Sequence, residues 1–182
     1  MPYGSGCKRC AVGGCSLCDV GSYNNAGVCA PCDDPHCLVC SGPGSCTLCN
    51  TADHFIVALG ACVCDGGYAF NNSDSTCVSC SAWIAGCLAC SDSSTCVTCD
   101  LAANFIPALA DTCSCKIGYY LFGGLCLPCS LVGCYDCSDA TTCVQCDTTS
   151  HFIQNGLSCA CDTGYYGQGG TCLSCSVMTG CL

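Results

Sequence analysis

One repeated order of cysteines constrains the fold of this chain more than any other feature. Four similar C-x-x-C pairs begin at Cys29, Cys77, Cys126 and Cys172, at steps of 48, 49 and 46 residues. A period of this length is the signature of tandem structural repeats. We therefore predict three complete repeats, which occupy residues 29–76, 77–125 and 126–171.

Each complete repeat contains eight cysteines, numbered here as positions 1 to 8. Three C-x-x-C pairs come first, then a loop of 12 or 13 residues, and then a C-x-C pair. In the first complete repeat the eight positions are Cys29, Cys32, Cys37, Cys40, Cys46, Cys49, Cys62 and Cys64. Residues 1–28 form a shortened repeat, and residues 172–182 begin another. Since both ends fall inside the pattern and no signal peptide precedes it, we expect a piece of a longer array.

The number of cysteines indicates where such a chain is stable. There are 31 among 182 residues, a density typical of disulfide scaffolds. Disulfides persist in oxidising compartments, so we expect an extracellular or cell-surface protein.

Apart from cysteine, little in each repeat can form a core. The long loops carry Phe55, Phe105 and Phe152, and a Gly-Tyr sequence follows each C-x-C pair. We predict that each Phe packs against disulfides. Turn-forming residues are frequent and no segment keeps a helical apolar period. The predicted fold class is small disulfide-rich repeats, mostly coil with short β-hairpins and little or no helix, in an elongated rod-like array.

The charge of the chain excludes two kinds of partner. The net charge is −10, every acidic residue is Asp, and the strong bases are Lys8, Arg9 and Lys116. Nucleic acids and anionic membrane surfaces need clustered bases. The longest apolar run, residues 55–64, is about half the ~20 residues of a membrane span. We therefore expect no nucleic-acid partner and no membrane span.

No residue set predicts an enzyme. The histidines His36, His54 and His151 are scattered, and Asn104 takes the place of one of them in the second repeat. Thiol–disulfide oxidoreductases use one reactive C-x-x-C on a βαβ scaffold, and no such pattern occurs.

Two metals are alternatives to a metal-free chain. Paired C-x-x-C motifs also bind zinc, but Ser, Asp or Asn follows the pairs here and histidine is scarce. Calcium needs several converging oxygens. The candidate carboxylates follow cysteine pairs, and they are Asp65, Asp100, Asp147 and Asp162. We expect no cofactor, and we keep calcium as a lesser alternative.

The non-cysteine residues add a family resemblance. The stretch C-x-C-D-x-G-Y-Y-x-x-G-G-x-C from Cys159 to Cys172 resembles the end of an epidermal-growth-factor-like (EGF-like) module. The C-x-x-C arrays resemble furin-like and growth-factor-receptor cysteine-rich repeats. The whole pattern is most similar to cysteine-rich surface proteins of protists, such as ciliate surface antigens and Giardia variant surface proteins.

The EGF-like resemblance implies disulfide pairings that spacing alone leaves open. The last two cysteines of such modules bond to each other, which gives Cys64–Cys77, Cys115–Cys126, Cys161–Cys172 and, by analogy, Cys18–Cys29. The same register suggests Cys40–Cys49, Cys46–Cys62 and Cys32–Cys37. It leaves Cys7 unpaired or bonded to another chain.

Two further residues are candidates for surface roles. Asn71 begins the N-x-S sequon, so it is a candidate glycosylation site. Trp83 lies in the extended six-residue spacer between Cys80 and Cys87. It is a candidate ligand contact, although packing against the next module is the preferred interpretation.

The sequence therefore favours a structural or surface-display role. We expect a rod or filament-forming component of a coat or appendage, which associates with itself head-to-tail or laterally. The first alternative is a fragment of an adhesin or receptor ectodomain that binds a protein or a glycan. The second alternative is a zinc-binding C-x-x-C protein.

Overall fold

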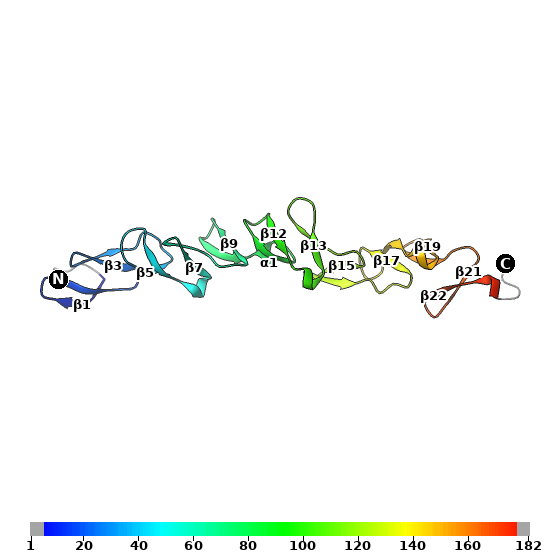
Figure 1. Ribbon diagram of the computed structural model, residues 1–182, viewed down its shortest axis with the longest axis horizontal. Coiled ribbons are helices and arrows are strands. Elements are labelled where there is room, and N and C mark those ends of the chain that lie inside the picture. The colour runs from blue at the N-terminus through cyan, green and yellow to red at the C-terminus, as the bar shows by residue number, and fades with distance from the viewer. Residues whose placement is uncertain (1–5, 178–182) are drawn as a thin grey trace. The chain divides into compact units, whose positions relative to one another are not determined.

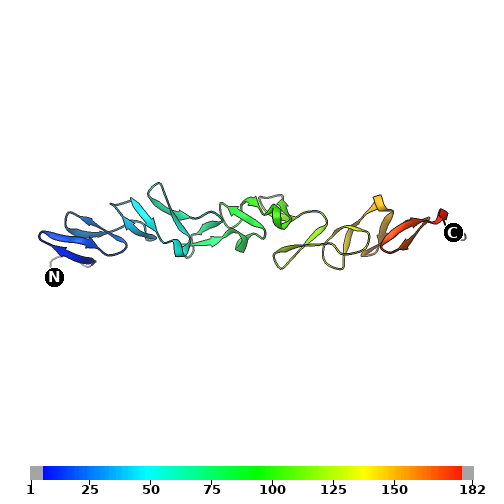
Figure 2. The ribbon, with the colours of Figure 1, turned by 60° about the horizontal axis from the view of Figure 1, so that its bottom comes forward.

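A computed structural model describes residues 6–177 of the protein (Figure 1). The chain divides into two compact units. The first contains residues up to 82 together with 89–93, and the second contains 83–88 together with the residues from 94 onward. In each unit, two-stranded β-hairpins follow one another along the chain (Figures 1 and 2). Among residues 6–177, no helix is long and apolar enough to cross a membrane.

Every strand pairs with its neighbour in the sequence. The N-terminal hairpins join β1 (Cys7–Ala11) to β2 (Gly14–Cys18) and β3 (Ser22–Asn25) to β4 (Val28–Pro31). The next three hairpins join β5 (Cys37–Cys40) to β6 (Cys46–Cys49), β7 (Phe55–Ala58) to β8 (Ala61–Cys64), and β9 (Tyr68–Asn71) to β10 (Thr76–Ser79). A 3-10 turn, η1 (Thr51–Asp53), precedes β7.

The later repeats follow the same order. After the one-turn helix α1 (Cys80–Trp83) come β11 (Cys87–Cys90), β12 (Cys96–Cys99), η2 (Leu101–Ala103), β13 (Phe105–Pro107), β14 (Cys113–Cys115), β15 (Tyr119–Phe122) and β16 (Leu125–Pro128). The last elements are β17 (Cys134–Cys137), β18 (Cys143–Cys146), η3 (Thr148–Ser150), β19 (Phe152–Asn155), β20 (Ser158–Cys161), β21 (Tyr165–Gln168), β22 (Thr171–Ser174) and η4 (Cys175–Val177). The predicted fold class of disulfide-rich hairpin repeats with almost no helix is confirmed.

The structural repeat has the predicted period, but its boundaries differ from the predicted ones. Three hairpins form one complete unit, as in β5 to β10. The predicted boundary between residues 76 and 77 falls inside β10, and the boundary between 125 and 126 falls inside β16. A sequence period fixes the length of a repeat and leaves its starting point free.

The turn before each buried Phe explains two of the repeated polar residues. The side chains of Asn50, Asp100 and Asp147 accept backbone N–H hydrogen bonds and cap η1, η2 and η3. This is the standard use of Asn and Asp at a helix N-terminus. Each turn ends on a residue in the left-handed conformation, and these residues are His54, Asn104 and His151. The imidazoles of His54 and His151 stack on Tyr68 and Tyr165 at 3.9 Å between ring centroids.

Each complete repeat has a small core that consists of cysteine sulfurs and one Phe side chain. Phe55, Phe105 and Phe152 are 1%, 2% and 6% exposed. Each belongs to a cluster that otherwise consists largely of cysteines. The prediction that each Phe packs against disulfides is confirmed. Burying one Phe contributes roughly 1.5–3 kcal/mol, so the bridges must supply much of the stability.

Candidate functional site: the disulfide ladder and an apolar pocket

The disulfides repeat one pattern along the chain. Position 8 of each complete repeat bonds to position 1 of the next unit, which gives Cys64–Cys77, Cys115–Cys126 and Cys161–Cys172. The shortened repeat has Cys18–Cys29. These four bridges are the ones that the EGF-like resemblance implies. Each ties the end of one hairpin to the second strand of the next.

The three inner bridges of each repeat differ from expectation. In the first complete repeat they are Cys32–Cys40, Cys37–Cys46 and Cys49–Cys62. Positions 2–4, 3–5 and 6–7 pair in the same way in the other two, as Cys80–Cys90, Cys87–Cys96, Cys99–Cys113, Cys129–Cys137, Cys134–Cys143 and Cys146–Cys159. The expected pairings Cys40–Cys49, Cys46–Cys62 and Cys32–Cys37 are therefore wrong.

The reason lies in the hairpin β5–β6. Its two strands are the second and third C-x-x-C pairs, with Cys40 opposite Cys46 and an irregularity in the register between them and Cys37. This bulge brings Cys37 within 5.7 Å of Cys46, measured between Cα atoms, and the two are bonded. Cys40 is then free to reach back to Cys32, and Cys49 reaches forward to Cys62.

Among residues 6–177, the unpaired cysteine is Cys10 and not Cys7. Cys7 is bonded to Cys15, while Cys10 is an exposed free thiol whose Sγ lies 3.9 Å from that of Cys7. The register of β1–β2 pairs Cys7 with Cys18 and Cys10 with Cys15, which is the register of β5–β6. The N-terminal cysteines therefore occupy positions 3 to 6. Their spacing equals that of positions 1 to 4 of the third repeat. A cysteine at position 1 bonds to the preceding repeat, so this spacing by itself predicts an unpaired Cys7, which is wrong.

Four compact groups of sulfur atoms recur at equivalent places. Each group contains three cysteines whose sulfurs lie within 4.8 Å of one another. The groups are Cys7, Cys15 and Cys29; Cys37, Cys46 and Cys62; Cys87, Cys96 and Cys113; and Cys134, Cys143 and Cys159. Every one of these sulfurs is in a disulfide. Because a metal is bound by the thiolate, zinc would require these bridges to be reduced.

The four aspartates considered for calcium have local partners. Asp100 and Asp147 cap their 3-10 turns. One carboxylate oxygen of Asp65 accepts the N–H of Gly66, and one of Asp162 accepts the N–H of Thr163, both at 2.7 Å. Within residues 6–177, the groups of three or more candidate metal ligands contain sulfur and no carboxylate. Calcium binding stays a prediction.

The two surface candidates lie at the ends of short elements. Asn71 ends β9, and its Oδ1 accepts the backbone N–H of Ser73 at 3.1 Å. It is half-buried at the start of an exposed turn. Trp83 ends α1 and is also half-buried, beside the buried Ile84. Glycosylation of Asn71 and a ligand contact at Trp83 stay predictions.

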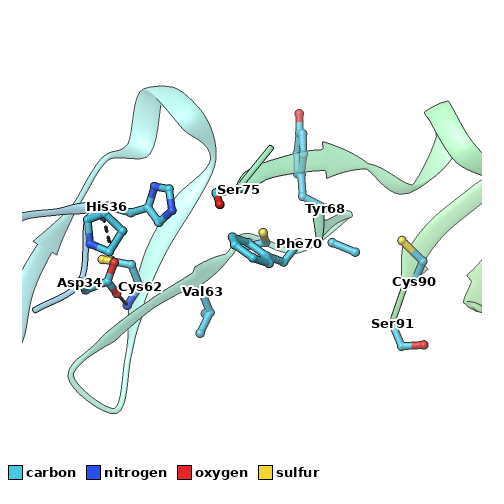
Figure 3. Close-up of a pocket in the computed structure, with 12 residues that line it drawn as sticks. Asp34, His36, Cys62, Val63, Tyr68, Phe70, Ser75, Cys90 and Ser91 are labelled. Carbon is cyan, nitrogen blue, oxygen red and sulfur yellow. Dashed lines mark hydrogen bonds between the residues drawn. The ribbon is translucent and has the colours of Figure 1, made fainter. Parts of the chain in front are cut away.

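The first of the two compact units contains a pocket of about 540 Å³ that no sequence motif predicted (Figure 3). Its walls include Asp34, His36, Val63, Ala69 and Phe70. Asp34 is fixed in place: its Oδ1 accepts the N–H of His36 at 2.9 Å, and its Oδ2 accepts the N–H of Cys62 at 2.8 Å.

The imidazole of His36 belongs both to the core and to this pocket. It stacks on Phe55 with ring centroids 3.9 Å apart and meets Phe70 edge-on at 6.2 Å. Its Nε2 is buried and has no hydrogen-bond partner among residues 6–177. Figure 3 shows Phe70 and Ser75 beside this imidazole, with Tyr68 further along the same wall.

Comparisons with known proteins give one partial similarity. The chain is 39% identical over 70 residues, 36% of its length, to furin-like protease 2 of Drosophila melanogaster. This match covers only 4% of that protein's length. No protein-family model matches the chain, and no solved structure does. The similarity and the bridges fit cysteine-rich repeats.

Proposed function

We propose that this protein is an extracellular structural or surface-display repeat protein without catalytic activity. The observation that carries the proposal is the recurrence of one unit, three hairpins and four bridges, with the same connectivity in every complete repeat. Such a unit contacts mainly its neighbours and extends by addition, as in other repeat proteins. Its dependence on disulfides supports an oxidising, extracellular location.

A rod or filament in a coat or appendage is the finer form of this proposal. Self-association, head-to-tail or lateral, would extend the repeats beyond one chain. The resemblance of the cysteine pattern to protist surface proteins supports a place on the cell surface. Negative-stain electron microscopy of the purified protein tests this form: we expect filaments with an axial repeat, and discrete monomers at all concentrations would contradict it.

The extracellular proposal itself is tested by the state of the cysteines in protein taken from its native source. Among residues 6–177, iodoacetamide without reduction should label one cysteine, Cys10. Reduction first should expose all 31 cysteines. If the unreduced protein were labelled at most of its cysteines, both the disulfide ladder and the extracellular location would be wrong.

A ligand-binding ectodomain is the second candidate function, and one observation favours it. The pocket beside His36 is largely apolar, open to solvent, and lined by a partly exposed aromatic ring, Phe70. A concave apolar site with a few fixed polar groups is the usual form of a binding site. A protein segment or a glycan would be the ligand of such an adhesin or receptor fragment.

A further inference from the structure

We propose that the pocket formed by Asp34, His36, Ala69 and Phe70 binds a basic peptide segment and takes up a tyrosine side chain from it. This inference rests on the second candidate function, a ligand-binding ectodomain, and names the partner by its chemistry. Three features carry it, and the first two are absent from the other complete repeats.

The first feature is a missing phenol ring. Ala69 is the second residue of β9, and the same place in β3, β15 and β21 is held by Tyr23, Tyr120 and Tyr166. The register confirms this equivalence, because each of these residues is paired with the second residue from the end of its partner strand. Tyr23 packs against the sulfur cluster of the following hairpin. Ala69 instead lines an open pocket.

The second feature is the imidazole of His36. In the other two complete repeats Gly86 and Gly133 take its place. The hydrogen bonds show this, because the carbonyl of His36 accepts the N–H of Asn50, and the carbonyls of Gly86 and Gly133 accept the N–H groups of the equivalent residues Asp100 and Asp147. A Cβ added to Gly86 or Gly133 would lie 2.1 or 2.2 Å from the ring of the buried Phe. No side chain fits there, whereas His36 lies flat on Phe55.

His36, which lines the pocket, also has a buried polar atom that lacks a partner. Buried polar atoms in folded proteins are almost always hydrogen-bonded, yet Nε2 of His36 is not. A phenol hydroxyl can donate or accept a hydrogen bond, so it suits either tautomer of this imidazole. The ring of Phe70, 44% exposed, offers an edge or face to an incoming aromatic ring.

The third feature is the charge around the pocket. Between Arg9 and Lys116 the chain has nine Asp residues and no Lys or Arg. Asp34 lines the pocket, and Asp33, Asp65, Asp74 and Asp92 are adjacent in sequence to residues that line it. Complementary charge steers association and excludes partners of the same sign. A peptide with Lys or Arg beside its tyrosine therefore fits better than an acidic peptide.

Binding of three labelled pentapeptides to the full chain tests the proposal by fluorescence anisotropy. The peptide GKYKG should bind at least tenfold more tightly than GKGKG, which lacks the ring, and GEYEG, which reverses the charge. The affinity for GKYKG should fall as salt is raised from 50 to 500 mM, because exposed charges are screened. Equal affinity for GKYKG and GKGKG would overturn the proposal.

Two variants locate the site. Ala69→Tyr restores the ring that the other repeats carry at this place, so it should leave the fold intact and weaken GKYKG binding at least tenfold. Phe70→Ala should weaken binding about tenfold. The matched control is Phe122→Ala, which removes a 68% exposed ring from β15 that is not among the residues lining the pocket, and should bind as the parent does.

Two other outcomes separate this inference from the function on which it rests. If neutral oligosaccharides bound saturably and Ala69→Tyr abolished their binding, the peptide assignment would be overturned while a ligand-binding ectodomain would stand. If the chain bound itself through this pocket, shown by a self-association in sedimentation that Ala69→Tyr removes, the occupant would be a second copy and the peptide assignment would again fall. Normal peptide binding by Ala69→Tyr would also overturn it.

Discussion

The close approach of Gly133 to the ring of Phe152 leads to a sharp prediction. The Gly133→Ala change adds one methyl group, whose carbon would lie 2.2 Å from the ring. Gly133 also has φ +71, and an alanine in this left-handed region costs roughly 1–2 kcal/mol. Crowding of a packed core adds typically 1–3 kcal/mol. The repeat should therefore lose about 2–5 kcal/mol.

A second glycine of the same unit separates the two effects. Gly156 has φ +64 and nothing within 4 Å of an added Cβ. Gly156→Ala should therefore cost only the backbone term, roughly 1–2 kcal/mol. The difference between the two variants measures the steric contact with Phe152.

Amide hydrogen exchange followed by NMR is the suitable assay, since it reports the stability of one repeat while the bridges stay closed. The N–H of Asp147 donates to the carbonyl of Gly133 at 2.8 Å, so it is a direct probe. Its protection should fall by roughly thirtyfold or more in Gly133→Ala, because each 1.4 kcal/mol is a factor of ten. In Gly156→Ala the loss should be about fivefold to thirtyfold. Equal losses in the two variants would refute the argument that Phe152 excludes a side chain here.

Three other predictions test the bridges, the caps and the metals. Replacing Cys49 and Cys62 together by Ala opens a loop with a sequence separation of 13 and should lower stability to urea by about 3 kcal/mol, whereas Cys10→Ala removes no bridge and should leave it unchanged. The pKa of Asp147 lies below its ordinary value of 3.8, because the hydroxyls of Ser150 and Thr149 donate to the carboxylate. The cap therefore stabilises η3 above pH 3.8 and is lost as the pH falls through the lowered pKa. In a carboxyl NMR titration Asp139 should have a pKa of about 2, mainly because the backbone N–H of Thr141 donates to it, and midpoints near 3.8 for both would contradict these hydrogen bonds. Removing metal ions with EDTA should leave the melting temperature unchanged, and a fall reversed by calcium would show that the carboxylates do bind it.

The sequence predicted those features that depend on a repeated local pattern. The period of the cysteines, the buried Phe of each repeat and the bridge from Cys64 to Cys77 all follow from short motifs that recur. The inner bridges depend on a bulge in β5–β6, and the spacing of the cysteines carries no sign of it. Spacing also fails to show that Cys10, and not Cys7, is unpaired. The four N-terminal cysteines differ by only one residue in spacing from positions 3 to 6 of the first complete repeat, whereas they match positions 1 to 4.

The pocket could not be predicted for a different reason. It arises from small differences between aligned repeats, Ala69 for a tyrosine and His36 for a glycine. Aligning His36 with Gly86 requires the hydrogen bonds that their carbonyls accept, since the spacers between Cys32 and Cys37 and between Cys80 and Cys87 differ in length. A repeat pattern is found from the residues that repeats share, whereas this pocket depends on two residues in which the first complete repeat differs from the others.

The order of the bridges has a consequence for proteolysis. Each bridge, or each overlapping pair of bridges, closes a loop of the chain. Only one or two residues lie between successive loops and outside any loop, such as Val63 between Cys62 and Cys64. These short links lie inside paired strands, as with residues 47–48 in β6 and Val63 in β8. A protease that cuts an exposed loop therefore leaves both fragments joined by sulfur. The two fragments therefore separate only after the bridges are reduced.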